Sequence, residues 1–95
     1  MLLIRETLIA KPGMASKLAK LMQEMFEESD DTARVMTDLT GQFNQVVIET
    51  EYEGLEEFGS RMEEYRSNVD MGKKMRDMGY TDMYQTGSRE IYQIW

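Results

Sequence analysis

Cysteine and histidine are absent from this 95-residue sequence, and it has one proline, Pro12. Without cysteine, the chain has neither disulfides nor thiolate metal sites, and it gives no information on the redox compartment. The absence of histidine removes the commonest transition-metal ligand and the commonest general base. We therefore expect no metal site and no cofactor. The length fits one domain, over residues 1–95.

Basic residues and long apolar segments are also scarce. The chain has 11 Lys and Arg against 18 Asp and Glu, a net charge of −7. Nucleic acids and anionic membrane surfaces attract basic patches, so we expect no nucleic-acid partner and no membrane partner. No apolar run is long enough to span a bilayer, and the start of the chain lacks the pattern of a signal peptide. By elimination, these features favour a cytoplasmic protein.

The hydrophobic patterning predicts four strands and two helices, with a further short helical stretch after the second helix. The predicted strands cover residues 2–9, 32–39, 45–52 and 84–94. The predicted helices cover residues 14–28, a segment beginning at Gly54, and residues 70–78. Gly13 is the expected N-cap of the first helix, Glu57 the capping-box acid of the second, and Gly79 the C-cap of the third. We expect a kink in the last strand at Gly87.

This order of elements predicts an α+β, ferredoxin-like βαββαβ fold, with an antiparallel sheet and helices on one face. The other face of the sheet then has nothing within one chain to cover it. An apolar sheet face that stays exposed favours association. We therefore expect a homodimer in which two such faces bury each other around a two-fold axis.

Three segments resemble the dimeric α/β-barrel superfamily. Lys11-Pro12-Gly13 is similar to the turn after its first strand, residues 37–49 to the hairpin of its NIPSNAP-like members, and residues 87–92 to their closing strand. The resemblance implies a dimeric barrel, often with a cavity between sheet and helices. The superfamily includes cofactor-free antibiotic biosynthesis monooxygenases, polyketide cyclases and haem-degrading enzymes. The chain departs from the haem-binding members because it has no histidine.

Charged residues within the strands are the main candidates for a site: Arg5, Arg34, Asp38, Glu49, Glu51 and Arg89. One interpretation is a polar cavity in which Arg5 or Arg89 holds an anionic or carbonyl substrate. Glu49 would then act as a base if burial raised its pKa. The alternative is an ion-pair network at a dimer interface or a solvated sheet edge. The candidate catalytic residues are thus Arg5, Arg34, Glu49 and Arg89.

Methionine and aromatic residues have two interpretations each. The methionines at helical spacing indicate either a pocket for a flexible ligand or ordinary core: Met14, Met22, Met25, Met71, Met75 and Met78. The aromatic residues near the end of the chain indicate a pocket mouth or an interface: Tyr80, Tyr84, Tyr92 and Trp95. We expect the pair Asp30-Asp31 to form a solvated turn, because it lacks the spaced ligands of a calcium loop.

The sequence leaves three functions open. The first is a homodimeric α/β-barrel protein with a small-molecule pocket between sheet and helices, for a small hydrophobic or aromatic ligand. The second is a cofactor-free monooxygenase or cyclase that acts on an aromatic or polyketide-like substrate. The third is a non-catalytic structural or regulatory interaction domain. Fold alone does not choose among them.

Overall fold

The computed structural model describes residues 1–29 and 31–95. Its strands are β1 (Leu2–Ala10), β2 (Ala33–Thr37), β3 (Gln45–Tyr52) and β4 (Tyr84–Gln93). Its helices are α1 (Ala15–Glu27), α2 (Leu55–Ser67) and α3 (Val69–Asp77), followed by a short 3-10 turn, Tyr80–Asp82. The strands form one antiparallel sheet in the order β2-β3-β1-β4. This confirms the predicted ferredoxin-like arrangement.

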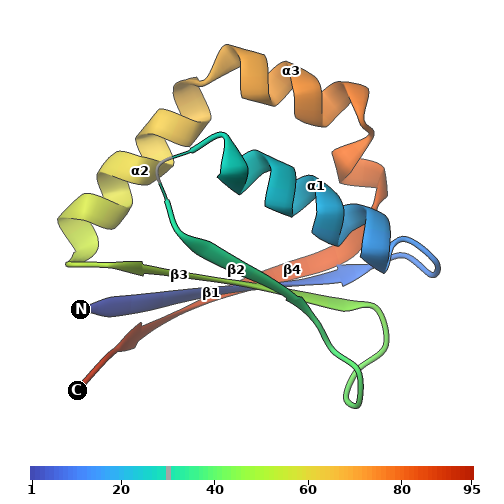
Figure 1. Ribbon diagram of the computed structural model, residues 1–95, viewed down its shortest axis with the longest axis horizontal. Helices are drawn as coiled ribbons and strands as arrows, with labels where there is room; N and C mark the ends of the chain where they lie inside the picture. Colours follow the sequence, from blue (N-terminus) through green and yellow to red (C-terminus); the bar gives the residue numbers. More distant parts are fainter. Residues whose placement is uncertain (30) are drawn as a thin grey trace.

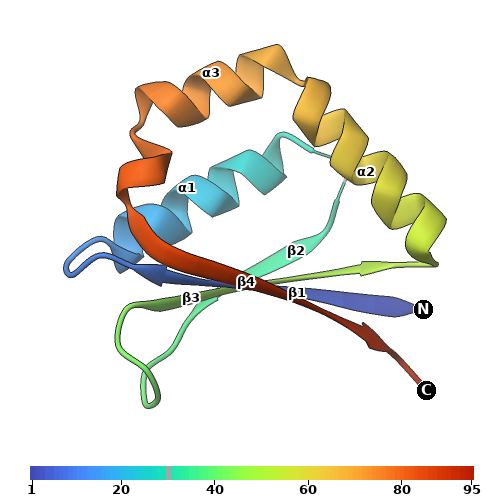
Figure 2. The same cartoon turned by 180° about the vertical axis from the view of Figure 1, so that it is seen from behind.

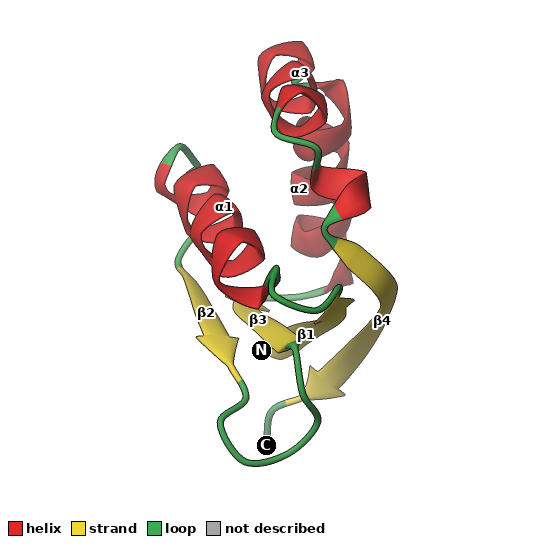
Figure 3. Cartoon of the chain, turned by 90° about the vertical axis from the view of Figure 1, so that its right-hand side faces the viewer, coloured by secondary structure: helices red, strands yellow, loops and turns green. Residues whose placement is uncertain are grey.

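All three helices lie on the same side of the sheet (Figures 1 and 2). Seen from the side, α1 stands over the β2 side of the sheet, while α2 and α3 stand apart from α1 and extend above it (Figure 3). No helix within residues 1–29 and 31–95 is long and apolar enough to cross a membrane. Because all three helices lie on one side of the sheet, its other face carries no helix; we call this face the open face.

Local sequence explains most of the helix boundaries. Asn68 ends α2 and caps α3, because its side chain accepts a hydrogen bond from the N–H of Met71 at 3.0 Å. The C-cap of α3 is Met78, one residue before the predicted Gly79; Gly79 follows it with a φ of +73°, a left-handed conformation that glycine adopts readily. Glu57 accepts from the N–H of Glu53 at 2.9 Å, close to the expected capping box. The prediction for Gly13 is wrong: it lies in the turn at φ +82°, and Met14 is the N-cap of α1.

The main core lies between α1 and the sheet. It consists of side chains from α1, the central strands and the turn after α3: Leu8, Ala10, Leu18, Leu21, Met22, Val46, Ile48 and Met83. A smaller cluster, Leu2, Ile4 and Tyr52, packs against Phe58 of α2. Helix α2 itself has no buried residue. Its side chains of intermediate exposure are Phe58, Arg61, Met62 and Tyr65.

The pairing of β4 with β1 is regular from Gln93 to Thr86 and then shifts, so that Ala10 faces Tyr84. The irregularity therefore lies at Gln85, and the predicted kink at Gly87 is wrong. Gly87 faces Leu8 within the regular part of the pairing. A Cβ at this glycine would lie 2.9 Å from a methyl group of Leu8. The position thus favours glycine because the Leu8 side chain packs directly over it.

The open face is less apolar than expected. Alternation along β1 places Leu3, Arg5, Thr7 and Ile9 on it, opposite the buried residues of that strand. In register with Arg5 stand Glu49 on β3 and Glu90 on β4. A band of charge thus crosses the middle of the face, because the strands bring these three residues into one row. The open face therefore combines apolar residues with charged ones.

Candidate functional site

Three of the four candidate residues form an ion-pair network on the open face. Glu49 accepts from Arg5 Nε through Oε2 and from Arg34 Nη2 through Oε1, each at 2.8 Å. The Glu49 side chain is only 10% exposed. Its hydrogen bond is the main cause that raises the pKa of Arg5. Both carboxylate oxygens of Glu49 are used to join β3 to β1 and β2. The arrangement therefore has the geometry of an ion-pair network between strands and not that of a substrate site.

Asp38 has a separate, local role. It follows the end of β2 and accepts hydrogen bonds from the N–H groups of Thr40 and Gly41, at 2.8 and 2.6 Å. These two bonds lower the pKa of the Asp38 carboxyl. It therefore shapes the β2–β3 turn and does not join the network around Glu49.

Arg89 lies on the helix-covered side of the sheet, opposite the other three candidates. It pairs with Glu6 across β1 and β4. Arg89 Nε donates to Glu6 Oε1 at 2.7 Å, and Nη2 contacts the same oxygen. Its guanidinium carbon also lies 5.4 Å from the centre of the Phe58 ring. A site that combines Arg89 with Glu49 is excluded, because the sheet separates them.

A cavity of about 160 Å³ lies beside Arg89, between the sheet and the helices. Its polar wall contains Glu6, Thr50, Tyr52, Tyr65 and Arg89. Its apolar wall comes from α1, from α2 and from the sheet: Ile4, Met25, Phe26, Ile48, Phe58 and Met62. Elements far apart in the sequence thus bring convergent polar groups to one apolar space, which is the usual composition of a small-molecule site.

Asp31 organises one end of this region. Its Oδ2 accepts from the hydroxyls of Tyr52 and Tyr65, at 2.7 and 2.6 Å, and Arg61 Nε lies 3.2 Å from its Oδ1. The Asp31 side chain is 7% exposed. The prediction of a solvated turn is therefore wrong for Asp31, while Asp30 lies outside the described residues. One feature of the sequence indicates such a partner. Alternation along β3 places Tyr52 on the buried face of the sheet, where its hydroxyl needs a hydrogen-bond acceptor.

The two phenols remain protonated at neutral pH. Burial, and then the hydrogen bond to Asp31, raises the pKa of Tyr65 to about 12. The same two causes, in the same order, raise the pKa of Tyr52 well above its ordinary value. Neither phenol is therefore placed to act as a phenolate base. Their role in the cavity wall is to hold fixed hydrogen bonds.

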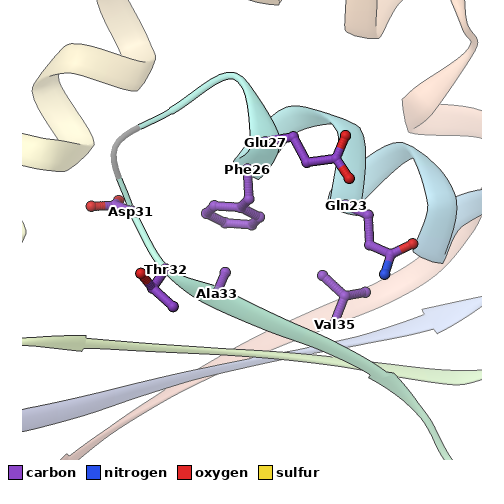
Figure 4. A pocket seen from close by; sticks show the side chains of 7 residues that line it. All are labelled: Gln23, Phe26, Glu27, Asp31, Thr32, Ala33 and Val35. Atoms are coloured by element: carbon purple, nitrogen blue, oxygen red, sulfur yellow. The ribbon is translucent and has the colours of Figure 1, made fainter.

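A second hollow, of about 290 Å³, lies between the end of α1 and β2 (Figure 4). The close-up shows the Phe26 ring directed from α1 toward Ala33 of β2, with Asp31 turned away from it. Phe26 lines both hollows. Its wall is more polar than that of the first cavity: Gln23, Glu27, Asp31 and Thr32 line it together with only three apolar residues, so it offers less apolar surface to a ligand.

The remaining sequence candidates divide between core and surface. Met25 lines the cavity, whereas Met14, Met22 and Met75 belong to or pack against the main core. Tyr80 and Tyr84 pack against each other, with ring centres 5.1 Å apart. Trp95 is fully exposed. Among residues 1–29 and 31–95, no group of three acidic side chains is arranged to hold a metal ion.

No protein-family model and no curated protein matches this chain significantly. Several solved structures, in contrast, have a similar fold. A NIPSNAP domain protein from Burkholderia xenovorans superposes with a TM-score of 0.84 at 14% identity, covering 100% of this chain and 95% of that one. A NIPSNAP family protein from Agrobacterium tumefaciens gives 0.80 at 11% identity, with 97% and 90% covered. An antibiotic biosynthesis monooxygenase gives 0.69 at 12% identity, with 100% and 99% covered. The chain therefore has the fold shared by NIPSNAP-domain proteins and antibiotic biosynthesis monooxygenases, as its sequence motifs predicted.

Proposed function

We propose that this protein binds a small hydrophobic or aromatic molecule in the cavity between sheet and helices. The observation that carries the proposal is the composition of the cavity wall. Phe26, Phe58 and Met62 supply apolar surface, while Arg89 and Tyr65 supply polar groups at its margin. An apolar space with a few convergent polar groups is typical of ligand sites.

The size of the cavity limits the ligand. An apolar cavity of about 150 Å³ holds a benzene molecule. The cavity here measures about 160 Å³, so the buried part of the ligand is about one ring, or a short branched chain. A larger molecule would place the rest of its body outside, beyond Glu6 and Arg89, which are both partly exposed.

We also propose that the protein works as a homodimer, with the open faces of two copies packed together. Leu3, Ile9 and Val47 supply apolar surface on either side of the charged band, and each is only partly buried within one chain. The saturated pairing of Glu49 with Arg5 and Arg34 supports this arrangement, since paired charges cost less to bury than single ones.

The position of Arg89 in the cavity wall supports one alternative, a cofactor-free oxygenase or cyclase, an activity named for a protein of similar fold. In that case an acidic substrate would lose its proton to water, and Arg89 would stabilise the resulting enolate or phenolate in the cavity. Oxygen would add to the carbanion carbon, and the peroxide anion would then take up a proton from water. Oxygen uptake with a panel of quinols and anthrones tests this function. Turnover would support it if Arg89→Ala lowers the rate at least tenfold and Arg34→Ala, on the open face, leaves the rate unchanged. The absence of turnover would remove it.

Ligand binding is tested by filling the cavity. Calorimetric titration with toluene and related single-ring compounds should give saturable binding to the native protein. Met62→Trp places a larger side chain in the cavity wall and should abolish it, whereas Met78→Trp, at an exposed position after α3, should leave it unchanged. Saturable binding that survives Met62→Trp would contradict the proposed site. The absence of binding to the native protein would favour a structural or regulatory interaction domain.

A further inference from the structure

We infer that the ligand of this cavity is a small amine, with a compact ring or chain as its body and a protonated nitrogen as its polar group. The inference rests on the proposed function, because it names the ligand class for the same cavity. Three features of the wall support it: the phenol hydroxyls already donate to Asp31, Glu6 lies at the margin, and aromatic rings line the space.

The phenols of the wall cannot donate to a ligand. Tyr52 and Tyr65 each have one hydroxyl proton, and Asp31 is the nearest acceptor of both, at 2.7 and 2.6 Å; the Tyr65 hydroxyl also lies 3.3 Å from Ser29 Oγ. What each phenol still offers is an oxygen lone pair and a ring face. A ligand that meets these two oxygens must therefore supply the donor.

The Glu6–Arg89 pair also favours a donor ligand. Both contacts from Arg89 go to Oε1 of Glu6, and Oε2 makes no hydrogen bond with the residues that the structure describes. An ammonium group could bind Oε2 without breaking the existing pair. A carboxylate ligand would find the charge of Arg89 already neutralised by Glu6, and it would stand beside the negative charge of Glu6 itself.

Four aromatic rings complete the wall: Phe26, Tyr52, Phe58 and Tyr65. The face of an aromatic ring attracts a cation through its quadrupole. Arg89 already lies over the Phe58 ring, at 5.4 Å from its centre, so the other three rings are the ones left for a ligand cation. The flexible side chains of Met25 and Met62 can adapt to the body of the ligand. The net charge of −7 also favours the approach of a cation.

The experiment compares four probes of one size: benzylamine, benzyl alcohol, toluene and benzoate. Calorimetry at pH 7 and low salt measures the affinity of each for the native protein. We expect benzylamine to bind about tenfold more tightly than toluene, and benzoate to bind most weakly. Equal binding of benzylamine and toluene, or tighter binding of benzoate, would overturn the inference and leave the proposed function intact. If none of the four binds, both fail.

Variants separate the role of each polar group. Tyr65→Phe keeps the ring and removes the oxygen, so benzylamine should lose about fivefold in affinity and toluene should lose none. Tyr80→Phe, which lies outside the cavity, serves as the matched control and should change neither affinity. An equal loss for both ligands in Tyr65→Phe would overturn the assignment of its oxygen.

Glu6→Gln provides an independent measurement that does not involve the phenols. It keeps the shape of the side chain but removes the charge that holds Arg89. Benzylamine should bind more weakly to this variant, and benzoate more tightly, because Arg89 becomes available to an anion. If the preference between the two probes does not move toward benzoate, the wall does not select by charge and the inference is wrong.

Discussion

Tyr65 donates its hydroxyl to Asp31, a residue 34 positions earlier in the chain, at 2.6 Å. This bond ties α2 to the segment that precedes β2. Arg61, one turn earlier on the same helix, pairs with the other oxygen of Asp31. Since α2 has no buried residue, these polar bonds and the ring contacts of Phe58 hold it over the cavity.

Removal of the Asp31 side chain should therefore destabilise the protein strongly. Asp31→Ala removes the nearest acceptor of two phenol hydroxyls and one ion pair of Arg61, in a nearly buried position. We expect the free energy of unfolding to fall by about 2–4 kcal/mol, measured by urea denaturation. Asp77→Ala, at an exposed position at the end of α3, should change it by less than about 0.5 kcal/mol. A loss below about 1 kcal/mol in Asp31→Ala would show that α2 is held by other contacts.

Stability should also fall at high pH because of the same phenols. Burial and Asp31 raise the pKa of Tyr65 from 10.0 to about 12. Between these values the folded state binds more protons than the unfolded state, so this contribution is fully present below pH 10 and is lost as the pH rises toward 12.

Thermal melts from pH 9 to 11.5 and the phenolate absorbance at 295 nm measure this effect. The native protein should lose thermal stability over this range, and its late-ionising phenols should appear above pH 10. Tyr65→Phe should show a shallower decline and one fewer late-ionising phenol. An unchanged decline in Tyr65→Phe would mean that the Asp31 network does not govern the alkaline transition.

Two glycine substitutions should act in opposite directions. Gly59 lies in the middle of α2 with open space around its missing Cβ, so Gly59→Ala should stabilise the protein by about 1 kcal/mol through helix propensity. In Gly87→Ala, the new methyl group meets Leu8 at 2.9 Å, and the loss should be about 1–3 kcal/mol. Chemical denaturation of both variants, compared with the native protein, checks the pair. A Gly87→Ala variant that is not destabilised would contradict the packing described at Leu8, and a destabilised Gly59→Ala variant would contradict the open space around Gly59.

The proposed dimer predicts a specific effect at the centre of the open face. The native protein should have the mass of two chains by light scattering at micromolar concentration. Val47→Glu places a third carboxylate beside Glu49 and Glu51 on that face and should give single chains. Val69→Glu, which lies 77% exposed at the start of α3, is the matched control and should remain a dimer. A native protein that is monomeric would contradict the arrangement.

The sequence was sufficient for the elements and their order, because these depend on local patterns. The strand predicted over residues 45–52 matches β3 at both ends, and Gly79 follows the end of α3 in a backbone conformation that few other residues adopt. The N-cap of α1 and the C-cap of α3 were each misplaced by one residue. Gly13 instead occupies the left-handed position of the preceding turn.

The candidate site depended on information that local patterns do not contain. The pairing of Glu6 with Arg89 requires the register between the first and last strands, and that register puts Arg89 on the face away from Glu49. Asp31 was interpreted as solvated because its neighbours in the sequence are polar. Its partners, Tyr52 and Tyr65, come from β3 and α2, and only the tertiary structure brings them to it.

Amide chemical-shift mapping by NMR during a titration with toluene shows most directly whether a ligand occupies the cavity between sheet and helices. The shifts should be saturable and largest at Ile4, Thr50, Phe58 and Met62, which line the cavity from three elements. Shifts confined to open-face residues such as Thr7 and Val47, or no saturable shift at any amide, would contradict the proposed ligand site.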